Sequence, residues 1–480
     1  MIKQSPQFKG CASSSSEESG FDICIIGAGM AGASIAAYLA PKGIKIALID
    51  YSFEEKKRIV GELLQPGAVL SLKQMGLGHL LDGFDAQPVE GYAILQGDER
   101  ITIPYPTDYR GMGLHNGLFL QQIRASALDN ESVTQIHGKA LQLQENERNE
   151  IIGVNYRDSL TSKTKTIHAP LTITSDGFFS NFREHLSNNE KTVTSFFIGL
   201  ILKDCDMPFP KHGHVFLSGP TPFICYPISS NEVRILIDFP AEQLPKKQLI
   251  QTYLDVNVTP YIPEGMLNSY QQALQEGGFK VMPNHYMAAK PIVRKGAVLL
   301  GDALNMRHPL TGGGLTAIFS DIQILSAHLL AMPDFNNIDL IHEKIEAYYR
   351  ERQNANANLN ILANALYGVM SNDLLKTAVF KYLQCGGMNA QESIAMLAGL
   401  NRNHYTLMKQ FCFLTAFGAG NLVRHNISNL PKAIKLLADA IVIIKPLLKN
   451  EVPLAVLFYR YLEKMKYLAY SGYGANIQRP

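Results

Sequence analysis

A glycine-rich turn between two short apolar runs constrains the fold more than any other feature of this chain. The first run, Phe21 to Ile26, leads into GAGMAGASIAAYLAPKG, and the second run, Ile44 to Ile49, ends at Asp50. Residues 31–39 are mostly good helix formers, and Gly43 is typical of a helix end. Because strands joined through a helix lie parallel by a right-handed crossover, the pattern predicts a Rossmann-like α/β unit that binds a dinucleotide.

The turn carries the spacing GxGxxG directly after a strand and at the start of a helix. There, backbone N–H groups can meet a pyrophosphate, and an acidic residue ending the next strand can accept hydrogen bonds from ribose hydroxyls. A tight turn that binds nothing is the alternative, but the strand–turn–helix context disfavours it. The residues expected to contact the cofactor here are Gly27, Gly29, Met30, Ala31, Gly32, Asp50 and Tyr51.

Two later apolar runs also end in glycine and aspartate, namely APLTITSDG at 169–177 and GAVLLGD at 296–302. Asp302 precedes the run Gly312 to Gly314 and a helix-like segment. A carboxylate at Asp176 or Asp302 suits the ribityl chain of a flavin, and glycine amides at a helix N-terminus suit its pyrimidine edge. Each aspartate alone is typical of a turn, but the three motifs in this order indicate FAD and a discontinuous nucleotide domain.

The segment between these motifs has a different pattern. SFFIGLILKD, HVFLSG, PFICYPIS and EVRILIDF are separated by short turn-rich pieces, which predicts an antiparallel sheet inserted into the α/β domain as a wall over a ligand. From about Asp339 the pattern turns helical. We therefore expect a disordered polar tail over 1–20, an FAD domain over 21–184 plus 285–345, a substrate-binding sheet over 185–284, and a helical, membrane-associating region over 346–480.

Charge and cysteine content argue against several classes of protein. A net charge of +2 over 480 residues gives no electrostatic basis for binding nucleic acid. The six cysteines form no CxxC pair, so we expect no metal site and no disulfide framework.

Residues 401–480 hold eleven Lys or Arg against three Asp or Glu, and their apolar blocks are broken by Lys and Pro. This predicts a segment that lies on an anionic lipid surface, with a soluble helical cap as the alternative.

Several longer stretches resemble one family. GELLQPGAVLSL, VEGYAILQG, IPYP and above all GDALNMRHPLTGGGLTAIFSDI look like squalene epoxidases (squalene monooxygenases), within the FAD-dependent aromatic-hydroxylase class of flavoprotein monooxygenases. The resemblance implies epoxidation of squalene to (S)-2,3-oxidosqualene for sterol synthesis, with dioxygen and a flavin C4a-hydroperoxide. It also implies electrons from a separate NADPH-dependent reductase, and attachment to the cytoplasmic side of a membrane, the endoplasmic reticulum in a eukaryote, through the C-terminal helices.

The resemblance also implies roles for single residues. It implies FAD contacts from Arg58, Arg124, the backbone of Ala140, Gly313, Gly314 and Leu315, the last in place of a frequent methionine, and a hydrogen-bonded pair of Gln65 and Tyr92 beside the flavin. No protein nucleophile is expected, since FAD and dioxygen supply the chemistry. His115, His285 and His308 therefore receive no acid or base role, and His308 is expected to shape the flavin loop.

Two other functions share parts of this pattern. An aromatic-ring flavin hydroxylase has all three motifs, whereas a non-enzymatic prenyl carrier of the Rab-escort type would have degraded ones. The chain departs from animal and fungal squalene epoxidases in its polar first twenty residues, which argues against an N-terminal anchor, and in Asn116 and Leu118, where many relatives are more basic.

Overall fold

The computed structural model describes residues 20–55, 58–244 and 246–451. The polar tail expected over 1–20, except Gly20, and the apolar block Val452 to Leu468 lie outside these residues.

The first sheet has seven strands in the order β10-β9-β8-β2-β1-β11-β17. Its strands are β1 (Ile23–Ile26), β2 (Ile46–Asp50), β8 (Val133–Glu145), β9 (Ile151–Asp158), β10 (Thr164–His168), β11 (Leu171–Thr174) and β17 (Ala297–Leu299). β8, β2, β1, β11 and β17 pair in parallel, while β9 and β10 add an antiparallel hairpin. The four predicted apolar runs form four of the parallel strands, and strands buried on both faces are typical of such sheets.

Helices cover this parallel sheet. They include α1 (Met30–Leu39), α3 (Asn116–Leu128) and α7 (Gly314–Leu330), with α2 (Pro66–Gln74) and α4 (Arg183–Leu186) nearby. The described residues also include short 3-10 turns, some of them in other parts of the molecule: η1 (Ala40–Lys42), η2 (Gly78–Leu81), η3 (Gly177–Phe179), η4 (Thr259–Tyr261), η5 (Gly301–Ala303), η6 (Pro309–Thr311) and η7 (Ile427–Asn429). The fold class expected for the FAD domain is confirmed.

The second sheet has seven strands in the order β16-β12-β15-β14-β13-β5-β6. They are β5 (Gly91–Gln96), β6 (Glu99–Pro104), β12 (Thr192–Lys203), β13 (His212–Phe216), β14 (Phe223–Pro227), β15 (Glu232–Phe239) and β16 (Lys280–Tyr286). A small sheet of β3 (Leu63–Leu64), β7 (Gly111–Gly113) and β4 (Gln87–Val89) lies beside it. Helices α5 (Lys247–Asn257) and α6 (Glu264–Gln275) pack on one face.

This second sheet differs from the expected insert in two respects. The hairpin β5–β6 comes from residues 91–104, far outside 185–284, and β5 pairs with β13 in parallel. The sheet is therefore mixed at that edge. The edge of β13 pairs with a hairpin that is distant in sequence, and the local sequence pattern of a strand does not predict which distant strand it pairs with.

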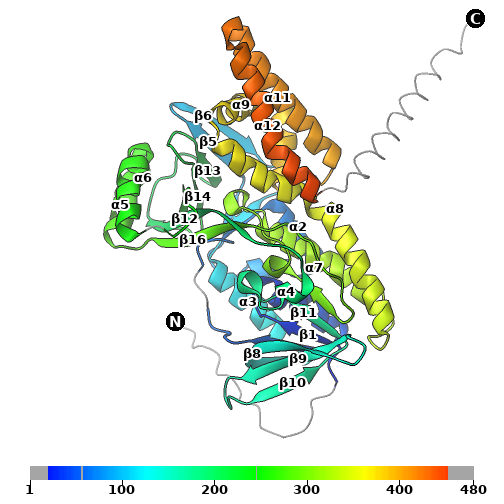
Figure 1. The fold of residues 1–480 in the computed structure, drawn as a ribbon. Coiled ribbons are helices and arrows are strands. Elements are labelled where there is room, and N and C mark those ends of the chain that lie inside the picture. Colours follow the sequence, from blue (N-terminus) through cyan, green and yellow to red (C-terminus); the bar gives the residue numbers. More distant parts are fainter. Residues whose placement is uncertain (1–19, 56–57, 245, 452–480) are drawn as a thin grey trace, which may run out of the picture.

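The C-terminal region is helical, as expected. It contains α8 (Ile338–Met370), α9 (Asp373–Gln384), α10 (Gly387–Leu397), α11 (His404–His425) and α12 (Leu430–Glu451). α8 runs without a break across the boundary expected at 345/346, so one helix joins the FAD domain to the C-terminal helices. In Figure 1, α9, α11 and α12 project at one end of the molecule, the first sheet lies at the other end, and the second sheet lies between them.

The second sheet has two apolar faces. The outer face packs against α5 and α6 through residues such as Phe196, Ile198 and Ile235. The inner face, which we define as the face carrying Tyr92, Ile94, Ile101, Ile103, Val215, Ile224, Leu236 and Phe197, packs against Leu310 and residues of α8, α9 and α10. Several inner-face side chains, including Tyr92 and Ile94, are only half-buried.

Candidate active site

The three glycines of the first motif lie in different environments. Gly27 has φ +96°, and a Cβ there would lie 2.6 Å from the carbonyl oxygen of Ser175. A Cβ on Gly32 would lie 1.9 Å from the carbonyl oxygen of Gly27. Gly29 has φ −74°, and apart from Gly29 itself and its two chain neighbours no heavy atom of the described chain lies within 4 Å of its Cβ position. Gly27 and Gly32 are thus required by the packing of the turn, whereas Gly29 leaves open space at the N-terminus of α1.

Asp50 is buried at the end of β2 and is bonded to the same turn. Its Oδ2 accepts a hydrogen bond from the Ala28 N–H at 2.8 Å, and its Oδ1 accepts one from the Ser52 N–H at 3.1 Å. Met30 and Ala31 begin α1 beside this turn, and the Tyr51 side chain is exposed. The carboxylate therefore fixes the position of the glycine-rich turn relative to the second strand.

The two arginines implied by the resemblance differ. Arg124, on α3, is buried, and its Nε and Nη1 donate to the carbonyl oxygens of Ala28 (2.8 Å) and Glu54 (3.0 Å). Arg58 is exposed. Ala140 is half-buried on β8, three residues beyond the Asp50–His137 pair, so it lies at the carboxyl edge of the parallel strands. Arg124 thus holds the backbone of the glycine-rich turn, so its role in cofactor binding is to position that turn.

Arg183 joins the second and third motifs. Its Nη2 donates to the carbonyl oxygens of Gly177 (3.0 Å) and Asp302 (3.1 Å), and its Nε donates to that of Ala303 (3.0 Å). Arg183 is not among the predicted site residues, although its position shortly after the SDG motif is a usable signal. The arginine brings the turns carrying Asp176 and Asp302 together.

One carboxylate oxygen of Asp176 is buried and accepts no hydrogen bond from the described residues. Its Oδ2 accepts from the Asn181 N–H at 3.0 Å, whereas its buried Oδ1 has no hydrogen-bond partner among the described residues. Burial raises the pKa of Asp176 above its usual value. Since a buried acceptor without a donor is costly, this oxygen fits a ligand hydroxyl such as those of a ribityl chain.

The third motif ends at the start of α7. Gly312 has φ +64°, Gly313 precedes the helix, and the Cβ position of Gly314 has no neighbour within 4 Å in the described chain. Leu315 is buried. The first N–H groups of a helix are unpaired within the helix and carry partial positive charge, so they can face an electron-rich ligand edge.

These features together fit FAD. Gly29 leaves room beside the N-terminus of α1, Asp176 offers an unpaired acceptor, and the N-terminus of α7 offers donors. In the described ranges there is no group of three or more His, Cys, Asp or Glu side chains that could hold a metal ion.

Gln65 is at the centre of a buried hydrogen-bond cluster beside the third motif. Its Nε2 donates to the Tyr92 hydroxyl at 2.5 Å and to the Thr311 carbonyl oxygen at 2.7 Å, and its Oε1 accepts from the Tyr105 hydroxyl at 2.7 Å. Burial raises the pKa of both tyrosines, so both hydroxyls keep their protons at neutral pH. Tyr105 is not among the predicted site residues, although it lies in the IPYP motif.

A buried ion pair supports the same region. Arg234 on β15 donates from Nε and Nη2 to the carboxylate of Glu62 at 2.6 and 2.9 Å. Both side chains are almost fully buried. The pair ties the segment before β3, which leads to Gln65, to the inner face.

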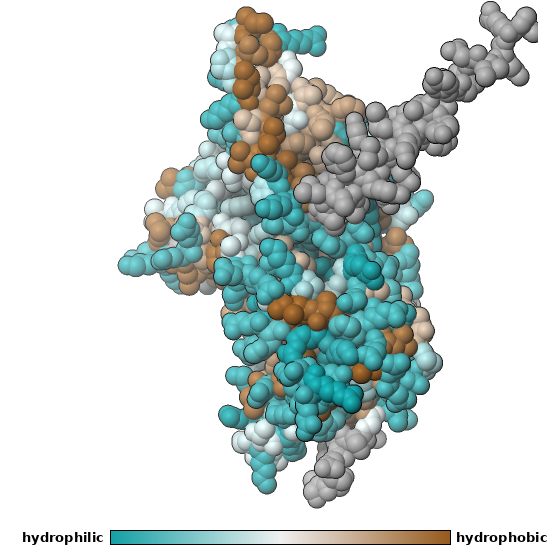
Figure 2. Space-filling view, turned by 45° about the vertical axis from the view of Figure 1, so that its right-hand side comes forward, coloured by the Kyte–Doolittle hydropathy of each residue, from teal (hydrophilic) through white to brown (hydrophobic). Residues whose placement is uncertain are grey.

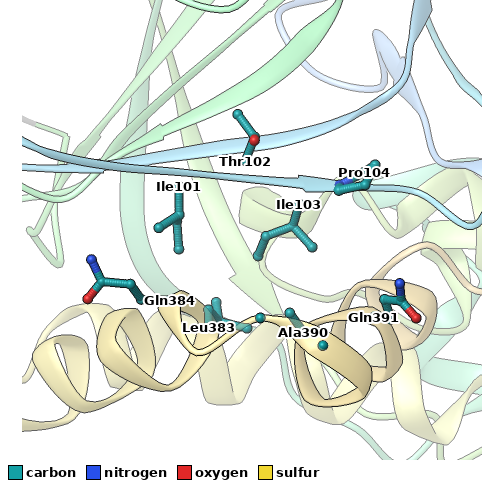
Figure 3. A pocket seen from close by; sticks show the side chains of 10 residues that line it. Ile101, Thr102, Ile103, Pro104, Leu383, Gln384, Ala390 and Gln391 are labelled. Atoms are coloured by element: carbon teal, nitrogen blue, oxygen red, sulfur yellow. The ribbon is translucent and has the colours of Figure 1, made fainter.

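A hollow lies between β6 and the helices α9 and α10 (Figure 3). It has a volume of about 230 Å³ and is lined by Ile101, Thr102, Ile103, Pro104, Leu383, Gln384, Gly386, Gly387, Ala390 and Gln391. Ile101 and Ile103 point from the strand toward Leu383 and Ala390, and the two glutamines add polar groups. β6 leads directly into Tyr105, so this apolar hollow and the Gln65 cluster share a strand.

The fold is that of flavin-dependent monooxygenases and halogenases. The flavin-dependent brominase Bmp2 superposes with a TM-score of 0.64 at 15% identity, covering 80% of this chain and 94% of that one. PqsL from Pseudomonas aeruginosa, described as a probable FAD-dependent monooxygenase, superposes with a TM-score of 0.62 at 17% identity, covering 75% and 99%.

Sequence comparison identifies the family. The family model for squalene epoxidase matches residues 168–435. Squalene epoxidase 3 of Arabidopsis thaliana is 39% identical over 90% of this chain and 84% of its own length, and the squalene monooxygenase of Mus musculus is 34% identical over 81% and 70%. The chain belongs to the squalene epoxidase family. The expected family and enzyme class are confirmed, which disfavours the aromatic-hydroxylase and prenyl-carrier alternatives.

Proposed function

We propose that this protein is an FAD-dependent squalene monooxygenase that converts squalene to (S)-2,3-oxidosqualene in sterol synthesis. Besides family membership, the main support is that the apolar inner face lies next to the Gln65 cluster and the N-terminus of α7. A long hydrocarbon needs an apolar wall close to the flavin, and the inner face supplies one. Two charged residues of this face, Arg234 and Asp238, are buried and hydrogen-bonded within the protein.

The reaction needs dioxygen, two electrons and two protons. One oxygen atom goes to the alkene and the other leaves as water. Bound FAD supplies the two-electron activation of dioxygen, and a separate NADPH-dependent reductase supplies the electrons. The residues of this chain hold the cofactor, orient the alkene through apolar contacts, and keep water out, since a wet site releases hydrogen peroxide instead.

The test is product analysis. Incubation with squalene, dioxygen, NADPH and a diflavin reductase should give 2,3-oxidosqualene and leave small phenols unchanged. Absence of oxidosqualene with several competent reductases would overturn the proposal.

The Gln65 cluster gives a sharper test. Tyr92→Phe removes one of the two acceptors of the Gln65 Nε2 group and leaves the Thr311 carbonyl in place, so FAD should stay bound. Turnover should fall about tenfold, which corresponds to a loss of about 1.4 kcal/mol. Tyr270→Phe is the matched control, because that tyrosine is buried on α6, where the helix packs against the outer face, and is not part of the Gln65 cluster. Equal turnover in both variants would show that the cluster has no part in the reaction.

We further propose that α12 seats the protein on a membrane surface, facing the cytoplasm at the endoplasmic reticulum in a eukaryotic cell. Ile434, Leu437, Ile441 and Val442 form an exposed stripe on α12, with Ile434 60% and Val442 72% exposed. Hydrophobic side chains run along the projecting C-terminal helices in Figure 2. Lys432, Lys435, Lys445 and Lys449 add positive charge, which suits anionic head groups. None of the described helices is long and apolar enough to cross a bilayer.

Surface substitutions test this better than truncation, because Leu436 and Ala440 of α12 belong to a buried cluster. Ile434→Asp with Ile441→Asp should abolish flotation with phosphatidylcholine–phosphatidylserine liposomes. Leu249→Asp, at an exposed apolar residue of α5, is the control and should float normally. Normal flotation of the α12 double variant would show that this stripe is not the membrane contact, and failure of the wild type to float would support a soluble helical cap.

A further inference from the structure

A second polar cluster is buried where the segment before α7 meets the inner face. The cluster consists of four side chains that are each at most 2% exposed: Ser195 on β12, Asp238 on β15, Asn284 on β16, and His308. The Ser195 Oγ lies 2.6 Å from the Asp238 Oδ1 and 3.1 Å from the His308 Nε2, and it accepts from the Asn284 Nδ2 at 2.9 Å. Nothing in the proposed reaction uses these groups directly.

The hydrogen bonds fix the direction of each proton. The Leu310 N–H donates to the His308 Nδ1 at 3.2 Å, so the single proton of the neutral imidazole is on Nε2. Burial lowers the pKa of His308 to about 3, which keeps the ring neutral. The Nε2–H therefore donates to the Ser195 Oγ, and the Ser195 hydroxyl donates to Asp238. The chain of donors runs in one direction, from His308 through Ser195 to Asp238.

This direction excludes two chemical roles. Ser195 cannot act as a nucleophile activated by His308, because the Nε2 that faces it already carries a proton and the hydroxyl is buried. The cluster cannot pass a proton toward the flavin loop either, because the Nδ1 of His308 is bonded to a backbone N–H, which gives up no proton. The remaining role of the cluster is to hold the neighbouring segment 309–314 in position.

His308 is held from several sides. The Tyr367 ring of α8 stacks on the imidazole at 4.0 Å between centroids, and the Phe197 ring meets it edge-on at 5.5 Å. The Asn364 side chain accepts from the His308 N–H at 3.3 Å. Three residues later, the Thr311 carbonyl accepts from Gln65. The ring thus fixes η6, which connects to both the Gln65 cluster and Gly312–Gly314.

We propose that His308, Ser195 and Asp238 are positioning residues that set the flavin loop 309–314 from the second sheet, and that they thereby determine how much of the oxygen used ends in epoxide and how much in hydrogen peroxide. The second half of this inference rests on the proposed function. When the loop is misplaced, dioxygen takes the same two electrons and two protons but leaves as hydrogen peroxide, with no oxygen transferred.

Two substitutions at one position separate the two bonds of the ring. In His308→Asn, the amide oxygen can replace Nδ1 as the acceptor for Leu310 N–H, but the link to Ser195 is lost. In His308→Gln, the amide nitrogen can replace Nε2 as the donor to Ser195, but the acceptor for Leu310 is lost. If the ring acts by holding the loop, His308→Gln, which loses the direct bond to Leu310, should raise the ratio of hydrogen peroxide to epoxide about tenfold. His308→Asn, which keeps that bond, should raise the ratio less. Equal ratios in wild type and both variants would overturn the proposal.

Ser195→Ala tests the link to the sheet. It should keep FAD bound but shift the flavin absorbance bands and raise the peroxide ratio. Ser326→Ala, on α7, is the matched control, because that serine is buried and its hydroxyl has no hydrogen-bond partner in the described chain. The flavin spectrum and peroxide release can be read without squalene, so failure of the wild type to make epoxide would refute the proposed function alone. An unchanged spectrum and peroxide release in Ser195→Ala would refute the positioning role alone.

Discussion

At the scale of single residues, the glycine motif separates a requirement of the fold from a requirement of the ligand. Gly29 has ordinary backbone angles, so another residue can adopt them, and the reason to keep glycine is the space beside α1. Gly29→Val should fold but bind no FAD, as read from absorbance of the purified protein. Gly32→Ala should fail to fold stably, since its Cβ would overlap the Gly27 carbonyl. Full FAD content in Gly29→Val would contradict the assignment of the nucleotide site.

The Glu62–Arg234 pair predicts a large loss of stability. Glu62→Gln leaves a buried guanidinium without its counter-charge, which should lower the free energy of unfolding by about 3–5 kcal/mol in urea denaturation. Replacing both residues together, as Glu62→Leu with Arg234→Met, should recover much of that loss, because no buried charge is then left unpaired. A single variant as stable as the wild type would contradict this account.

Asp238 predicts a pH dependence of stability. Burial raises its pKa from 3.8 to about 6, so between these values the folded state keeps a proton that the unfolded state has lost. Its contribution to stability is complete below about pH 4 and is lost as the pH rises through 6. Compared with the wild type, Asp238→Asn should therefore gain about 3 kcal/mol between pH 4 and pH 7. The lowered pKa of His308 acts in the opposite direction in both proteins, so denaturation curves of both must be compared; parallel curves would contradict the prediction.

At the scale of elements, α8 connects two regions that the sequence pattern assigns to separate domains. Arg352 on α8 donates to Asp321 on α7 at 2.8 Å, and Asn360 on α8 donates to Glu451 at the end of α12 at 2.8 Å. These bonds join the helix that starts at the flavin loop to the helix that carries the exposed apolar stripe. The predicted boundary at 345/346 therefore divides a single structural element.

The Asn360–Glu451 bond can be tested in α12. Glu451→Ala leaves the buried Asn360 donor without an acceptor, at a cost of about 1–3 kcal/mol, and should speed amide hydrogen exchange along α12. Glu451→Gln keeps an acceptor oxygen and should exchange like the wild type. If both variants exchange alike, this bond does not seat the helix.

At the scale of the whole molecule, the cofactor site collects residues from distant parts of the chain. Asp50, Asp176 and Gly314 come from three segments that only the first sheet and its helices bring together. FAD bound there should stabilise the whole FAD domain, by about 2.7 kcal/mol at one hundred times its dissociation constant. The melting temperature should therefore rise with added FAD in the wild type and stay constant in Gly29→Val; a constant value in both would contradict the site.

The parallel strands, the three nucleotide motifs and the family could be predicted from the sequence, because each depends on short runs of residues with a fixed local order. Four features could be found only in the folded chain: the β5–β6 hairpin that joins the second sheet, the clamp made by Arg183, the Tyr105 hydroxyl on Gln65, and the hydrogen bonds from His308 to Asp238. Each of these joins residues far apart in sequence, and a side chain with several donors can bond to whichever carbonyl or hydroxyl the packing brings near it. Burial then makes those bonds obligatory, since a polar group without water must find its partner within the protein.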